Sequence, residues 1–66
     1  MIIQNNKNFN KVKIMAKMLM NRNKYDYIVF ESNRAQNAVE IIPAKNFFDA
    51  GINYKAIICY LAYTGV

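Results

Sequence analysis

The sequence predicts an α+β fold, and three features of the chain support that prediction. A segment rich in lysine and methionine near the N-terminus has the apolar period of a helix, and a central aromatic and β-branched segment has the composition of a strand. Pro43 and Gly51 then bracket a short second helix. With 66 residues, the chain has room for one small domain.

The first helix is predicted to be basic and amphipathic, to begin at Asn8 or Asn10 and to end within residues 21–23. Its interior has no glycine or proline and is rich in good helix formers. With Asn10 as the N-cap, Phe9 and Ile14 would form a hydrophobic staple. At 100° per residue, one apolar stripe faces the core. The stripe contains Val12, Met15, Ala16 and Leu19.

A β-hairpin is predicted from two strands, at about residues 25–31 and 38–42, joined by a polar loop. In the first strand, alternate residues on both faces are apolar, with Val29 on one face and Phe30 on the other. We therefore expect this strand to be covered on both sides. Residues 1–3 form a possible extra N-terminal strand of the same sheet.

Two short C-terminal helices complete the predicted fold. Pro43 suits the first helical position, because its missing N–H would be unbonded there, and Gly51 suits the left-handed position that closes a helix. The first of these helices therefore covers residues 44–50.

The second C-terminal helix is predicted over residues 54–63. Asn53 would be its N-cap, with Ile52 and Ile57 as a hydrophobic staple. A short apolar run also fits a buried strand, so residues 56–63 could instead join the sheet. The capping pattern favours the helix over the strand.

Positive charge is concentrated in the N-terminal third of the chain. The formal net charge is +5, and six cations precede Asp26, which is the first acid. Such a block attracts phosphate, anionic lipid or an acidic protein surface. The alternative is a solvated face that keeps a small apolar protein in solution. The six cations are Lys7, Lys11, Lys13, Lys17, Arg22 and Lys24.

The composition argues against catalysis, a metal site or a bound cofactor. The chain has no histidine and one cysteine, and its four acids are spread singly. Cys59 lies in an apolar run with only Lys55 nearby, which favours a buried structural thiol over a reactive thiolate. The two glycines are too far apart for a phosphate-binding loop. We therefore predict a protein that is not an enzyme.

The outer side of the first helix is the predicted partner-binding surface. Ile14 and Met18 form a second apolar strip, one turn apart, among the cations. The chain also has more apolar surface than one small layer can cover, which predicts a homodimer or a tight protein partner, and the prevalence of symmetric oligomers favours the homodimer. The predicted binding residues are Lys11, Lys13, Ile14, Lys17, Met18, Arg22 and Lys24.

The predicted function is to bind a host protein and to inhibit or modulate it. An Asn-, Lys- and Ile-rich short chain is typical of low-GC phage or plasmid genes, so a nucleic-acid-handling defence enzyme with an acidic or nucleic-acid-binding groove is the expected target. The alternative is a small DNA- or RNA-binding regulator, because residues 49–61 resemble part of a helix-turn-helix. No secretory signal is visible and the longest apolar run, residues 56–63, is far below the ~20 residues of a membrane span. We therefore expect a cytoplasmic protein without a membrane partner.

Overall fold

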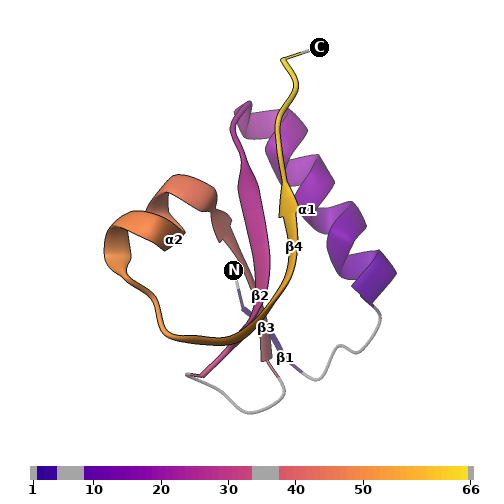
Figure 1. Ribbon diagram of the computed structural model, residues 1–66. Coiled ribbons are helices and arrows are strands. Elements are labelled where there is room, and N and C mark those ends of the chain that lie inside the picture. The colour runs from indigo at the N-terminus through magenta and orange to yellow at the C-terminus, as the bar shows by residue number, and fades with distance from the viewer. Residues whose placement is uncertain (1, 5–8, 34–37, 66) are drawn as a thin grey trace.

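The computed structural model describes residues 2–4, 9–33 and 38–65 and confirms the α+β class. An antiparallel sheet lies between two helices (Figure 1). The strand order is β1-β3-β2-β4, so β1 and β4 are the edge strands. The elements are β1 (Ile2–Gln4), α1 (Phe9–Asn23), β2 (Tyr27–Ser32), β3 (Ala38–Pro43), α2 (Ala44–Ala50) and β4 (Tyr54–Leu61).

Strand β2 is the centre of the fold, and both of its faces are buried, as predicted. On one face, Tyr27 and Val29 pack against α1, together with Ile41 of β3. On the other face, Ile28 and Phe30 pack against α2. The two helices therefore cover opposite faces of the sheet, and β2 belongs to both apolar clusters.

The predicted hairpin and the extra N-terminal strand are both confirmed. Strand β2 pairs antiparallel with β3, with Val29 opposite Ile41, and β3 pairs antiparallel with β1. The polar loop was predicted over residues 32–37, but Ser32 is the last residue of β2 and residues 34–37 lie outside the described residues.

Helix α1 has the predicted core-facing stripe. Val12 and Ala16 have no exposed surface, and Met15 and Leu19 pack beside them. The predicted N-cap is wrong: the helix already includes Phe9, so Asn10 lies in its first turn, and Asn8 lies outside the described residues.

The second helix is confirmed over residues 44–50, with one correction at its start. Pro43 is the N-cap and the last residue of β3, with φ −57° and ψ 136°, rather than the first helical residue. Gly51 ends the helix in the left-handed conformation, as predicted. The Ala44 N–H donates a 3.0 Å hydrogen bond to the Asp26 carbonyl, which attaches the start of α2 to the start of β2.

The predicted C-terminal helix over residues 54–63 is wrong, because this segment is strand β4. It pairs antiparallel with β2, from Tyr27 opposite Leu61 to Ser32 opposite Tyr54. A helix here would leave that edge of β2 without backbone partners, and pairing satisfies those groups. The predicted N-cap at Asn53 and the helix-turn-helix resemblance both require a helix here, so they are wrong as well. The alternative strand interpretation was closer, although β4 is largely exposed rather than buried.

Two β-bulges shape β4. Val29 and Phe30 are opposite Cys59 and Ile57, so Ile58 is an extra residue, and Lys55 is a second one before Tyr54. Directly opposed residues of antiparallel strands point to the same face of the sheet. As a result, every third residue of this strand shares the α2 face. These residues are Tyr54, Ile57 and Tyr60.

The two-sided burial of β2 predicts how stability responds to a single lost methylene. Ile28→Val removes a methylene from a side chain that is 1% exposed and should lower the free energy of unfolding by about 0.5–1.5 kcal/mol. Ile14→Val, at a side chain that is 59% exposed, is the matched control and should change it by less than about 0.5 kcal/mol. Equal losses in urea unfolding would contradict the assignment of Ile28 to the core.

Candidate functional site

Six of the seven predicted binding residues lie on α1 and Lys24 follows its last residue. At 100° per residue, Ile14 lies almost opposite the buried Val12 and Ala16. Around the helix, Lys11, Met18 and Arg22 lie on one side of Ile14, and Lys13 and Lys17 lie on the other. We call these six residues the α1 outer surface; they are Lys11, Lys13, Ile14, Lys17, Met18 and Arg22.

The apolar strip within this surface is exposed, as predicted. Ile14 is 59% exposed and Met18 is 66% exposed, and Lys13 alone of the six is half-buried. Beside Met18 there is a hollow of about 500 Å³, lined also by Met15, Leu19 and Arg22. The surface therefore combines raised apolar side chains with an adjacent apolar depression.

The charges of α1 are not those that would best stabilise a helix. Its first turn has no acidic residue, and Lys11 and Lys13 lie near the N-terminal end, where the helix dipole disfavours cations. Arg22 in the last turn is the favourable exception. The helix dipole therefore gives no stabilising reason for cations at this end of α1.

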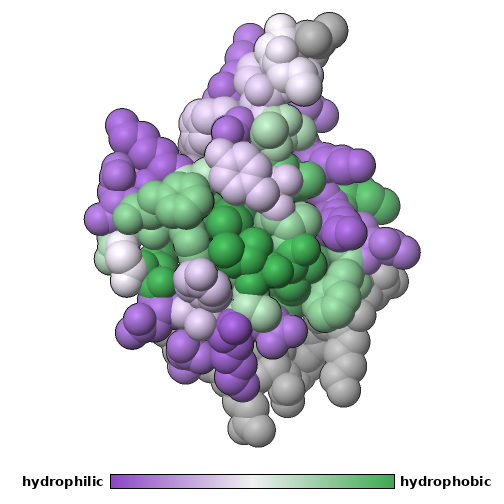
Figure 2. Space-filling model, in the orientation of Figure 1, coloured by the Kyte–Doolittle hydropathy of each residue, from purple (hydrophilic) through white to green (hydrophobic). Residues whose placement is uncertain are grey.

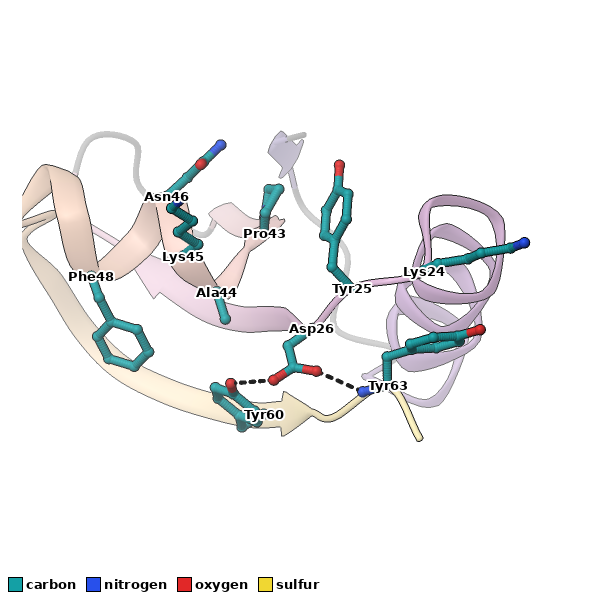
Figure 3. A pocket seen from close by; sticks show the side chains of 10 residues that line it. All are labelled: Lys24, Tyr25, Asp26, Pro43, Ala44, Lys45, Asn46, Phe48, Tyr60 and Tyr63. Atoms are coloured by element: carbon teal, nitrogen blue, oxygen red, sulfur yellow. Dashed lines mark hydrogen bonds between the residues drawn. The ribbon is translucent and has the colours of Figure 1, made fainter. Parts of the chain in front are cut away.

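A second concave region lies at the end of the sheet where β2 begins and β4 ends (Figure 3). It is a groove of about 650 Å³ and is lined by residues just before β2, at the start of α2 and around the end of β4. Aromatic rings, two lysines and one carboxylate share it. Its principal side chains are Tyr25, Asp26, Lys45, Phe48, Tyr60 and Tyr63.

Asp26 organises this groove. Its Oδ2 accepts a 2.6 Å hydrogen bond from the Tyr60 hydroxyl, and its Oδ1 accepts a 2.7 Å bond from the Tyr63 backbone N–H (Figure 3). The hydrogen bond from Tyr60 lowers the pKa of Asp26 below its ordinary value, and the bond from Tyr63 adds a smaller effect in the same direction. Both bonds favour the charged carboxylate. The same bond to Asp26 raises the pKa of Tyr60.

The sequence analysis identified Asp26 only as the first of four singly spread acids and missed this role. Its two partners lie 34 and 37 positions further along the chain, so no local pattern points to them. The contact exists because β4 pairs with β2, and that pairing was not the favoured prediction.

Tyr25, which lies two residues before β2, and Tyr27, its first residue, fix the other side of the groove. The Asn23 Nδ2 donates a 2.6 Å hydrogen bond to the Tyr27 hydroxyl, and the Tyr25 ring stacks on the Tyr27 ring at 5.3 Å between centroids. A hydrogen bond to Tyr27 raises the pKa of Tyr25. The end of α1 and the start of β2 are thereby joined through side chains.

The lining of the groove combines aromatic rings and amines with one hydrogen-bonded carboxylate. Asp26 already accepts a hydrogen bond on each oxygen, and the lining side chains include no thiol or imidazole. Cys59 is half-buried against the α1-facing cluster. Within residues 2–4, 9–33 and 38–65, no three histidine, cysteine, aspartate or glutamate side chains are grouped as metal ligands would be.

Comparison of the chain with models of known protein families, with curated proteins and with solved structures found no significant match. Neither of the two described helices has the length and apolar character needed to cross a membrane.

The Asp26–Tyr60 bond predicts a dependence of stability on pH at both extremes. Asp26 has a folded pKa below its unfolded value of 3.8, so its contribution is present above that value and is lost as pH falls through the folded pKa. Tyr60 has a folded pKa above its unfolded value of 10.0, so its contribution is present below that value and is lost as pH rises through the folded pKa.

Tyr60→Phe should therefore shrink both the acid and the alkaline loss of stability, measured by urea unfolding across the pH range. Tyr54→Phe removes a hydroxyl from the same face of β4 and is the matched control, which should keep both losses. An unchanged pH profile in Tyr60→Phe would show that the bond does not form in solution.

Lys24 supplies a prediction about the end of α1. It has φ 63°, and its N–H donates a 2.7 Å hydrogen bond to the Met20 carbonyl, as in a left-handed helix end. Lys24→Gly should raise the free energy of unfolding by about 0.5–1 kcal/mol, because glycine adopts this conformation without strain. Lys17→Gly, inside α1, should lower it by about 1 kcal/mol. A loss of stability in Lys24→Gly would contradict this conformation.

Proposed function

We propose that this protein is a non-enzymatic binding protein whose α1 outer surface docks onto an acidic surface of a partner protein. The observation that supports the proposal is the exposed strip of Ile14 and Met18 lying between two rows of cations. An apolar centre with a charged rim is the usual arrangement of a protein–protein interface.

The two kinds of residue have different roles in the proposed complex. Ile14 and Met18 lose water on docking and slow dissociation, because desolvated apolar anchors carry most of the binding energy. Lys13, Lys17 and Arg22 attract an acidic partner and speed association, an effect that salt weakens.

A protein partner fits this surface better than nucleic acid does. A phosphate backbone would engage the cations but would leave Ile14 and Met18 without an apolar partner. Residues 54–61 form a strand, so the helix-turn-helix resemblance no longer supports DNA reading. A small nucleic-acid-binding regulator is therefore the alternative function, and only the cations of α1 support it. The experiment below distinguishes the two.

The chemistry of the surface also narrows the kind of partner. A groove that binds nucleic acid is itself cationic and would repel α1, so the acidic surface is the better target of the two considered from the sequence. In its specific form, the protein is a phage- or plasmid-encoded inhibitor that needs no cofactor. It binds a host defence enzyme in the cytoplasm through an acidic surface of that enzyme.

The test captures partners from a nuclease-treated lysate and then measures the affinity of the purified partner for defined variants. Ile14→Ala with Met18→Ala should weaken binding roughly 10- to 100-fold, mostly through faster dissociation. Phe48→Ala, which truncates an exposed ring on α2, is the matched control and should leave the affinity unchanged.

Lys13→Glu with Lys17→Glu should slow association by at least about tenfold at low salt and much less at high salt. If nuclease abolishes capture, or if the alanine pair binds as tightly as the natural protein while affinity falls linearly with salt on logarithmic axes, the nucleic-acid alternative replaces the proposal.

A further inference from the structure

The outer edge of β4 is an unusual feature of the sheet that the proposed function does not use. Strand β4 is the last strand of the sheet, so one side of its backbone pairs with β2 and no described strand lies beside the other. Exposed edges are normally protected by charges, proline or short length. This edge is eight residues long and has one charge, Lys55. The opposite edge, β1, has three residues.

Apolar side chains gather over this strand. Figure 2 shows an apolar surface over β4 that extends toward α2. Tyr54 and Ile57 are each 44% exposed, Tyr60 is 48% exposed and the neighbouring Phe48 is 62% exposed. The Phe48 and Tyr60 rings lie 6.5 Å apart, so the α2 and β4 side chains form one patch.

The order of these side chains along β4 is symmetric. The bulges at Lys55 and Ile58 place Tyr54, Ile57 and Tyr60 on one face at equal spacings of three residues. On this face the order is therefore tyrosine, isoleucine, tyrosine whether the strand is followed forward or backward, with Ile57 at the centre. An antiparallel pair of identical strands has this symmetry, because residue i opposes residue j and residue j opposes residue i.

We propose that β4 pairs antiparallel with β4 of a second copy of this chain, with Ile57 on the two-fold axis. Each Tyr54 then lies opposite the other copy's Tyr60, and the two Ile57 side chains lie opposite each other. All of these residues are on the α2 face, as direct opposition in an antiparallel pair requires. The two sheets join into one continuous sheet across the axis.

The charges of the strand are compatible with this register. Each Lys55 lies opposite Cys59 of the second copy, so the two Lys55 ammonium groups are separated by four residues along the strands, roughly 13 Å, at which distance salt screens them. The two Cys59 thiols are separated by the same offset. The dimer therefore brings no like charges into opposition and forms no disulfide through the natural cysteine.

This inference is independent of the α1 outer surface, which lies on a helix and not on this edge. Sedimentation equilibrium from micromolar to millimolar concentration should give twice the 7.7 kDa chain mass at the upper end. Ile57→Lys places two ammonium groups opposite each other on the axis and should return the protein to one chain mass. Ile14→Lys, at an exposed isoleucine of α1, is the matched control and should stay dimeric.

Cross-linking tests the register without a charge change. In a Cys59→Ala background, Ile57→Cys should form a disulfide-linked dimer under mild oxidation, because its partner is the same residue of the second copy. Tyr54→Cys and Ile14→Cys should not, because their counterparts are not opposed. A monomeric mass at every concentration, a dimer that survives Ile57→Lys, or a dimer that links through Ile14→Cys and not Ile57→Cys would overturn the proposal.

Discussion

The structure depends on β2 being buried on both faces and paired along both edges. Tyr27 and Val29 hold α1 on one side, Ile28 and Phe30 hold α2 on the other, and β3 and β4 supply the backbone partners. A chain of 66 residues has little interior, so a strand that serves two apolar clusters gives each helix a core to pack on. All other elements are positioned relative to this strand.

The helix α1, the strand β2 and the end of α2 could be predicted from the sequence, because each depends on residues that are close together in the chain. The stripe of α1 repeats with the helical period, β2 is apolar on both faces, and Gly51 supplies the left-handed helix end. The prediction that failed, a helix over residues 54–63, depends on pairing between strands that are distant in the chain. Residues 54–61 have a composition that fits a helix or a strand, and the open edge of β2 decides between them.

The same distinction separates the two candidate sites. The α1 outer surface could be predicted because Ile14 and Met18 fall outside the core-facing stripe of a single helix. The Asp26 groove could not, since Tyr60 and Tyr63 reach it only after β4 has paired with β2. The exposed edge of β4 follows from the same pairing. Because residues 54–63 were predicted as a helix, neither the Asp26 groove nor this edge could be predicted.

Native-state hydrogen exchange, measured residue by residue in dilute protein, tests the central role of β2 most directly. The account predicts slow exchange throughout β2, whose amides have partners on both sides, and a mixed pattern in β4. In β4, amides directed at β2 should exchange slowly and outward-directed amides rapidly. Uniform protection across residues 54–63, as in a continuous helix, together with rapid exchange along one side of β2, would contradict the account.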